Sequence, residues 1–266
     1  MINTQIISVI NQKGGVGKTT TVINLATALS FYEKKVLVID LDPQGNATTG
    51  FGLSNSEGTK TIYDVLDGSC KFEDAINNTK INNLKLVSSN VDLSGLEVET
   101  ASENRRAFLL KDKLENFINS AKNDFSYIFI DCPPSLSLLT VMSLVVAKSL
   151  IVPLQAEFFA LEGLSQLMKT IDRVKIKLNP QLEIRGVLLT MYDKRNKLSA
   201  EVDTEARKFF KGKVYQTVIP RNVRLSEAPS HGVPILIYDK LCAGSKSYSS
   251  FAEEFLKQDS LMESAA

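Results

Sequence analysis

Two lysines flank a run of glycines in the segment NQKGGVGKTT, residues 11–20. Its second half, Gly17, Lys18 and Thr19, matches the end of the phosphate-binding pattern G-x-x-x-x-G-K-[ST]. The pattern places its first glycine at position 12, where this chain has Gln12, and Lys13 follows. Glycines let backbone N–H groups surround a phosphate, and a helix start adds the positive end of its dipole. The segment therefore predicts a nucleotide phosphate site rather than an ordinary glycine-rich turn, and it leaves the first lysine unexplained.

Carboxylates end two apolar segments and could serve the Mg²⁺ ion that accompanies a nucleotide. In this interpretation Lys18 contacts the β- and γ-phosphates, and the hydroxyl of Thr19 ligates the metal. Asp131 ends YIFID just before a Pro-Pro pair, and Asp40 and Asp42 lie in DLDPQGN. Asp40 and Asp42 share one side of their strand, so their charges repel unless a cation is near. We expect Asp131 to serve the metal; the alternative for all three is a turn or capping residue.

Short apolar segments alternate with longer amphipathic ones. The apolar segments are continuous, as in strands buried on both faces of a parallel sheet, and cover residues 5–10, 35–42, 127–133, 149–154, 184–190 and 214–220. Helical periodicity covers residues 18–30, 103–121, 161–178, 199–210 and 245–257. This alternation predicts an α/β fold, with a doubly wound, mostly parallel sheet and helices on both faces. Polar residues at the carboxyl ends of its strands would then face the ligand.

The same patterns predict the bounds of the domain, its tail and its surface loops. We expect one domain over residues 1–258 and a disordered tail over residues 259–266. The Asn-rich residues 77–83 and the residues 88–90 are expected to form surface loops. The first residues lack the basic start of a signal peptide, and no apolar run is long enough to predict a membrane helix.

The composition is that of an ordinary globular protein, with 44% hydrophobic residues, 23% charged residues and a net charge of +1. Such a chain is no polycation, so any contact with nucleic acid needs a local basic patch. Cys70, Cys132 and Cys242 are far apart and His231 is the single histidine. This spacing favours reduced thiols in a cytosolic protein over a disulfide framework or a metal cluster.

One segment departs from this balance of charge. Residues 194–224 contain nine basic and three acidic residues, a local balance of 9 − 3 = +6 against +1 for the whole chain. Such a segment is either a solvated helix face or a surface that binds phosphates without reading base sequence.

Six motifs together resemble the ParA/Soj branch of the deviant Walker A ATPases, within the ParA/MinD superfamily. They are KGGVGKTT (13–20), DLDPQGNAT (40–48), DCPPS (131–135), PLQAEFFALEGL (153–164), LLTMYD (188–193) and VIPRNVRLSEAPSHG (218–232). The likeness runs from about residue 6 to about residue 257, in the same order and with similar spacing. It implies a P-loop ATP hydrolase that depends on Mg²⁺ and turns over slowly without an activator.

The resemblance also implies roles for individual residues. Lys13 reaches across a two-fold interface to the ATP of the partner subunit, as an arginine finger does, and Gly14 is small because the partner's backbone passes close. Asp42 positions the attacking water, so Lys13, Lys18 and Asp42 are the catalytic residues. Asp40 supports the metal with Thr19 and Asp131. The expected ATP contacts are Lys13, Gly14, Gly15, Val16, Gly17, Lys18, Thr19 and Thr20 at the phosphates and Thr190, Met191, Pro220 and Arg221 at the adenine.

The implied partners follow from the same family. Arg195 and Arg224 match arginines that bind double-stranded DNA non-specifically, and the homodimer forms when ATP is bound. A Lys/Arg-bearing segment of a ParB-type protein activates hydrolysis, which releases the DNA. The expected location is the cytoplasm of a bacterium, in association with the nucleoid and with no membrane partner.

Three rival functions remain open at this point. A MinD-like membrane ATPase carries a basic amphipathic C-terminal helix, whereas residues 250–264 contain four acidic residues and one lysine, which anionic lipid would repel. A nitrogenase-reductase-like protein needs cysteine ligands for an iron–sulfur cluster, and Cys132 lacks a suitably placed second cysteine. A DNA-coating protein with ATP as a static clamp would differ in ATP turnover.

Overall fold

The computed structural model describes residues 4–54, 58–120, 122–157 and 160–265, without the side chains of residues 160–162 and 262–265. Phe158 and Phe159 of the motif at 153–164 therefore lie outside the described residues, as does the last residue of the expected tail.

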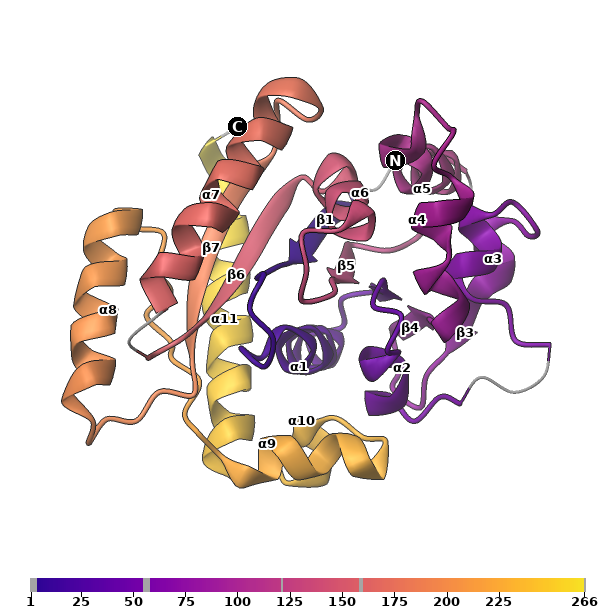
Figure 1. Cartoon of the computed structure of the whole chain (residues 1–266). Coiled ribbons are helices and arrows are strands. Elements are labelled where there is room, and N and C mark those ends of the chain that lie inside the picture. The colour runs from indigo at the N-terminus through magenta and orange to yellow at the C-terminus, as the bar shows by residue number, and fades with distance from the viewer. Residues whose placement is uncertain (1–3, 55–57, 121, 158–159, 266) are drawn as a thin grey trace.

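A 7-stranded sheet in the order β3-β4-β2-β5-β1-β6-β7 forms the centre of the molecule (Figure 1). The strands are β1 (Gln5–Val9), β2 (Val36–Asp40), β3 (Ile76–Asn78), β4 (Leu84–Val87), β5 (Tyr127–Asp131), β6 (Ser149–Gln155) and β7 (Glu183–Thr190). Neighbouring strands are parallel except β3 and β4, which are antiparallel. The predicted doubly wound, mostly parallel α/β fold is therefore confirmed.

Helices connect the strands and cover both faces of the sheet. The longer ones are α1 (Lys18–Phe31), α5 (Leu109–Ile118), α6 (Leu138–Val146), α7 (Ala160–Lys177), α8 (Lys197–Phe210) and α11 (Ala243–Ala265). The short ones are α2 (Asn46–Gly50), α3 (Ile62–Leu66), α4 (Leu96–Glu99), α9 (Val223–Glu227) and α10 (Ile235–Tyr238), with single 3-10 turns η1 (Phe72–Ala75), η2 (Val91–Ser94), η3 (Arg106–Phe108) and η4 (Ala228–His231). No helix in the described part of the chain is long and apolar enough to cross a membrane.

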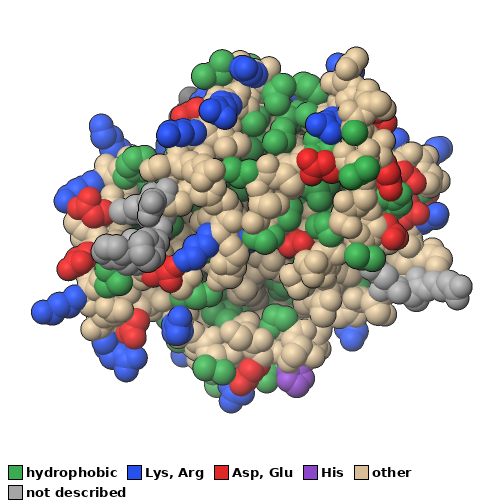
Figure 2. Space-filling model, in the orientation of Figure 1, with side chains coloured by type: hydrophobic (Ala, Val, Ile, Leu, Met, Phe, Trp, Pro, Cys, Tyr) green, Lys and Arg blue, Asp and Glu red, His purple; other side chains and the backbone are tan. Residues whose placement is uncertain are grey.

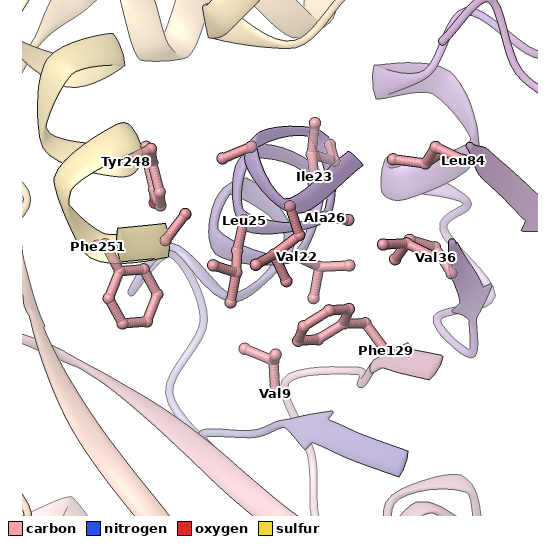
Figure 3. Packing of buried hydrophobic residues seen from close by; sticks show 14 of the residues in the cluster. Val9, Val22, Ile23, Leu25, Ala26, Val36, Leu84, Phe129, Tyr248 and Phe251 are labelled. Carbon is pink, nitrogen blue, oxygen red and sulfur yellow. The ribbon is translucent and has the colours of Figure 1, made fainter. Parts of the chain in front are cut away.

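Strand β2 shows why the apolar segments are continuous. Val36 and Val38 belong to the core beneath α1 and α11, whereas Leu37 and Ile39 belong to the core on the opposite face. Each face of the strand is thus buried, as a parallel sheet with helices on both sides requires. Figure 3 shows the first of these cores, where Val22 of α1 lies toward the sheet and Phe251 of α11 packs beside it.

The predicted strand at residues 214–220 is wrong. Isolated bridges at Val214 and at Pro220 join this segment to its neighbours, and the N–H of Ile219 donates to the carbonyl of Leu189 at 2.8 Å, but the segment forms no continuous ladder. Between them the backbone N–H groups of Gln216 and Thr217 donate to the carboxylate of Glu254 on α11, at 2.7 and 2.9 Å. Helix α11 therefore draws the middle of the segment away from β7, which interrupts the ladder.

Two further differences concern elements that the sequence did not predict. Strand β3 and strand β4 lie in or beside the Asn-rich stretch expected to be loop, and the apolar residues 138–146 form helix α6. Periodicity alone does not separate a short apolar helix from a buried strand or a plain apolar run.

Helix α11 continues past the expected end of the domain. The predicted boundary at residue 258 falls inside this helix, which extends to Ala265. The carboxylate of Asp259 accepts hydrogen bonds from the buried guanidinium of Arg185 on β7 at 2.6 Å and from the hydroxyl of Tyr127 on β5 at 2.5 Å. This part of the expected tail is therefore attached to the sheet; the division of the chain at residue 258 stays a prediction.

Candidate nucleotide site

The phosphate loop connects β1 to α1 and is fixed at its start by polar contacts of Asn11. The amide of Asn11 donates to the carbonyl of Pro153 at 2.8 Å, and its oxygen accepts from the N–H of Lys13 at 3.0 Å. Gly15 and Gly17 have φ angles of 74° and 88°, a left-handed conformation that favours glycine. Gly17 caps α1 without a side-chain hydrogen bond, so the first N–H groups of the helix remain available to an anion.

Lys18 is the buried lysine of the loop. Its side chain is 6% exposed and its Nζ donates to the carbonyl of Lys13 at 3.2 Å. Burial lowers the pKa of Lys18, while nearby Asp131, Cys132 and Asp42 act in the opposite direction. An ammonium group held in this position lacks most of its hydration, so it would gain strongly from a phosphate.

Asp131 and Asp40 are paired across neighbouring strands β5 and β2. Burial and the charge of Asp40 raise the pKa of Asp131 well above its usual value, while Thr19 and Lys18 act in the opposite direction. Both carboxylate oxygens of Asp131 are buried and make no hydrogen bond to described residues within ordinary distance limits. An orphaned buried carboxylate beside the hydroxyl of Thr19 fits the oxygen ligands that Mg²⁺ prefers, so these two residues would hold the metal.

Both carboxylate oxygens of Asp40, in contrast to those of Asp131, accept hydrogen bonds. Its Oδ2 accepts from the backbone N–H and hydroxyl of Thr48 at 2.8 and 2.7 Å, and its Oδ1 accepts from the N–H of Asp42 at 3.2 Å. Burial is the first cause that raises the pKa of Asp40 to about 6. Its oxygens thus hold the segment that leads into α2, and a role in supporting the metal stays a prediction.

Asp42 faces the phosphate pocket. It lines a cavity of about 440 Å³ together with Gly15, Lys18 and Thr19. Its Oδ1 accepts from the N–H of Gln44 at 3.0 Å, which fixes the carboxylate at the cavity wall. The structure therefore brings Asp42 to the same cavity as the loop, as its predicted contact with the attacking water requires.

A second cavity of about 410 Å³ adjoins the first at Gly17 and Thr20. It contains all four residues predicted to frame the adenine, Thr190, Met191, Pro220 and Arg221. The sequence analysis missed other lining residues: Ile219, Asn222, Val223, Leu225, Ser226, Pro229 and Tyr248. All but Tyr248 belong to the motif at 218–232, from which they could have been predicted. Tyr248 lies on α11, and no motif in the sequence pointed to it.

Thr190 also ties the end of β7 to the loop. Its hydroxyl donates to the carbonyl of Val16 at 2.8 Å. The side chain of Val16 is itself buried, so this residue can offer a phosphate only its backbone.

Lys13 lies apart from both cavities. Its side chain is 44% exposed and forms an ion pair with Glu157, and it lines neither cavity among the described residues. Gly14 lies beside it, and a Cβ atom there would meet only the Cβ of Pro134, at 3.8 Å. Nothing described within the chain therefore requires glycine at position 14.

Arg195 and Arg224 lie outside the nucleotide cavities, in the segment between β7 and α8 and in α9 (Figure 1). The structure adds three carboxylates that the count over residues 194–224 left out: Asp193, Glu227 and Asp239 form ion pairs with these arginines. The balance over the segment and these partners is 9 − 6 = +3. Figure 2 likewise shows basic side chains interspersed with acidic ones on the left of the molecule.

Comparisons with known proteins agree with this geometry. A family model described as AAA domain matches residues 4–184. The chromosome partitioning protein ParA of Caulobacter vibrioides is 51% identical over 255 residues, which cover 96% of this chain and 95% of that protein. The chromosome-partitioning ATPase Soj of Treponema pallidum is 46% identical over 250 residues, 94% of this chain and 96% of that protein.

Solved structures show the same fold with nucleotide. Cobyrinic acid a,c-diamide synthase from Mycobacterium smegmatis, with bound ATP analog and magnesium, matches with a TM-score of 0.84 and 34% identity over 96% of this chain and 94% of that one. The residues in the two cavities thus fit a nucleotide and Mg²⁺, and the identities above show the family. The chain belongs to the ParA/Soj family of chromosome-partitioning ATPases.

Proposed function

We propose that this chain is an ATP-switched DNA-segregation ATPase. Two subunits close on two ATP molecules, the closed dimer binds DNA without sequence preference, and a ParB-type partner stimulates hydrolysis, which releases the DNA. The identity to partitioning proteins exceeds that to the amide synthase, which favours this cycle over an amide-forming reaction.

The observation that carries the proposal is the position of Lys13. The loop already has a buried lysine at its own cavity, Lys18, whereas Lys13 is exposed and lines neither described cavity. A lysine that does not line the cavity of its own chain is available to a phosphate held by another chain. Gly14 supports the same view because its own chain leaves room for a Cβ atom. The need for glycine would then come from a partner backbone.

The chemistry that these residues perform is charge neutralisation and positioning. Lys18 would bind the β- and γ-phosphates in cis, Lys13 would add a positive charge in trans, and Asp42 would orient the water. Mg²⁺, held by Thr19 and Asp131, would neutralise charge on the phosphate oxygens. No strong base is part of this set, so slow turnover without an activator is expected.

Dimer closure would convert ATP binding into DNA binding. One exposed patch with Arg195 and Arg224 binds weakly, but two patches on one rigid dimer act together through effective concentration. The lysine- or arginine-bearing segment of a ParB-type activator would then add the charge that completes the hydrolysis site. A protein with this cycle would work in the bacterial cytoplasm, on the nucleoid.

Helix α11 does not support a MinD-like membrane function. Its aromatic side chains Tyr248, Phe251 and Phe255 are buried in the core, and its Glu254 and Asp259 bond to backbone or side chains of the same domain. The aromatic face of α11 up to Phe255 thus packs in the core and is not available to a membrane.

DNA retention with ATP, with ADP and without nucleotide tests the proposal, with the oligomeric state measured in parallel by size-exclusion chromatography. We expect a dimer and DNA binding only with ATP. DNA binding that is equal in all three states would contradict an ATP-driven switch, and a monomer with ATP would contradict the trans role of Lys13.

A further inference from the structure

Arg195 is held by a carboxylate two residues before it. Its Nε donates to Oδ1 of Asp193 at 3.1 Å and its terminal nitrogen donates to Oδ2 at 3.0 Å. The backbone N–H of Arg195 also donates to Oδ1, at 3.0 Å. The carboxylate is therefore fixed by the backbone of the residue whose side chain it binds.

Arg224 has a similar partner on its own helix. One terminal nitrogen donates to Oε2 of Glu227 at 2.9 Å, and the hydroxyl of Tyr238 on α10 donates to the same oxygen at 3.3 Å. Asp239 lies 3.8 Å from Nε of Arg224. Two elements thus place carboxylates beside this guanidinium.

We propose that Asp193 and Glu227 are built-in competitors of DNA phosphate for Arg195 and Arg224, and that they weaken DNA binding by a single subunit. This inference rests on the proposed function, in which the two arginines bind DNA. A carboxylate and a phosphate occupy the same fork of guanidinium donors. Asp193 fills the Nε edge of Arg195 with two parallel hydrogen bonds, so a phosphate must displace it or accept the poorer edge.

Each carboxylate competes with DNA phosphate only weakly, so DNA can still displace it. Arg195 is 90% exposed and Asp193 36% exposed, and exposed pairs of this kind change an equilibrium by about 1.4- to 5-fold. One subunit would bind less tightly by this small factor at each arginine. In a symmetric dimer these factors multiply, but the increase in affinity from joint binding is far larger. The carboxylates would thus suppress DNA binding by the free subunit while the closed dimer still binds.

The variant D193N tests this directly, because asparagine keeps an acceptor for the backbone N–H and removes the charge. We expect D193N to tighten DNA binding of the ATP-bound protein by roughly 2- to 25-fold, the square of the factor for one pair. The increase should vanish when Arg195 is alanine, so D193N/R195A and R195A should bind DNA equally. E227Q with R224A gives the same cycle at the second arginine.

Glu201 offers the matched control. It is exposed on α8 and forms no ion pair with described residues, so E201Q changes the net charge by the same amount without freeing an arginine. An increase in E201Q equal to that in D193N, or an increase in D193N that persists beside R195A, would show that net charge alone acts and would overturn the inference. Weaker binding by D193N would also overturn it, since Asp193 would then orient the arginine for DNA.

The nucleotide dependence gives a second readout. D193N/E227Q should bind DNA measurably without ATP, at protein concentrations where the parent does not, while the ATP-dependent dimerisation is unchanged. Parental retention without ATP would contradict the inference alone. If R195A and R224A bind DNA as the parent does, the DNA surface in the proposed function fails instead, so the two failures are distinguishable.

Discussion

Lys13 and Lys18 belong to one loop but have different surroundings. Lys18 is buried at the start of α1 with three acidic or thiol groups near it, whereas Lys13 is half exposed and pairs with Glu157. The buried ammonium group of Lys18 is desolvated, so its free energy falls when a phosphate binds beside it. The exposed ammonium group of Lys13 can bind a phosphate on another molecule.

The two lysines are therefore expected to fail differently. Lys18→Ala should reduce ATP affinity by roughly 10- to 150-fold, because alanine removes a charge-assisted hydrogen bond to phosphate in a buried site. Lys13→Ala should keep ATP affinity within a few-fold and abolish the ATP-dependent dimer. Titration with a fluorescent ATP analogue and analytical ultracentrifugation measure the two effects. Equal reduction of ATP affinity in both variants would show that Lys13 works in cis.

Asp42 is expected to act after binding. Asp42→Ala leaves the loop, Lys18 and Thr19 in place, so ATP should still bind and close the dimer, while hydrolysis should fall by about 100-fold or more because water is no longer positioned. Size-exclusion chromatography with ATP should show a dimer that persists. A monomeric variant, or one with parental turnover, would remove Asp42 from this role.

The buried pair Asp40 and Asp131 makes stability depend on pH. Both pKa values are raised, that of Asp40 to about 6, so the folded chain binds protons more tightly than the unfolded chain. The contribution of Asp40 is therefore complete below about pH 4 and disappears as pH rises through about 6, and the contribution of Asp131 also decreases as pH rises. We expect the free energy of unfolding of the ligand-free parent to fall by on the order of 1–3 kcal/mol between pH 5 and 7.5, and that of Asp131→Asn to fall less.

Urea unfolding at these two pH values, with and without Mg·ATP, measures this effect. Mg·ATP should restore the stability of the parent at pH 7.5 and should not restore that of Asp131→Asn to the same extent, since that variant lacks the carboxylate proposed to hold the metal. An identical pH profile in parent and variant would exclude Asp131 as the source.

At the scale of elements, the sequence predicts those strands and loops whose structure depends mainly on the residues of one segment. Strands β1, β2, β5, β6 and β7 have continuous apolar runs because both faces are buried, and the loop between β1 and α1 carries its own motif. Residues 214–220 also contain several apolar residues, but two of their backbone N–H groups donate to Glu254 on α11 instead of to a neighbouring strand. Tyr248 at the base cavity and the bond from Thr48 to Asp40 also depend on tertiary contacts, which spacing does not encode.

The C-terminal end of α11 gives a prediction at this scale. Arg185 is 2% exposed in its ion pair with Asp259 and lies 3.8 Å over the ring of Phe255. Removal of residues 259–266 would leave this buried charge without its carboxylate, which costs about 3–5 kcal/mol. Removal of residues 262–266 alone keeps Asp259 and serves as the control.

Thermal unfolding of the two truncated chains measures the difference. The longer truncation should unfold several degrees below the shorter one. Equal melting temperatures would show that residues 259–261, and with them the ion pair of Arg185 and Asp259, contribute nothing to stability.

At the scale of the whole molecule, one short region joins the nucleotide cavities to the basic surface. Helix α9 carries Arg224, and its Leu225 lines the second cavity, which contains the residues predicted to frame the adenine. The following turn η4 supplies Ser230 to the phosphate cavity. Gly232 directly follows this turn, and a Cβ atom on it would lie 2.7 Å from the Cα of Gly52, just after α2. A shift in the segment after Asp42 would therefore move η4, and η4 follows α9, which carries Arg224 of the proposed DNA surface.

The proposed DNA surface gives the prediction at this scale. Arg195→Ala and Arg224→Ala should each weaken DNA binding by the ATP-bound protein without changing ATP-driven dimerisation, because neither side chain contributes to the loop. A symmetric dimer presents two copies of each arginine, so each variant removes two arginine–phosphate pairs. The slope of log affinity against log salt should then fall by about 0.9 for each pair removed, or about 1.8 for each variant.

Fluorescence anisotropy with two duplexes of unrelated sequence, over a range of salt concentrations, measures that slope. The decrease in affinity should be the same for both duplexes because phosphates carry no sequence information. A parental slope in either variant would remove that arginine from the DNA surface. A failure to dimerise would place it at the closed interface instead, where α9 borders the base cavity, and the coupling between ATP and DNA would then run through dimer contacts rather than through two exposed patches.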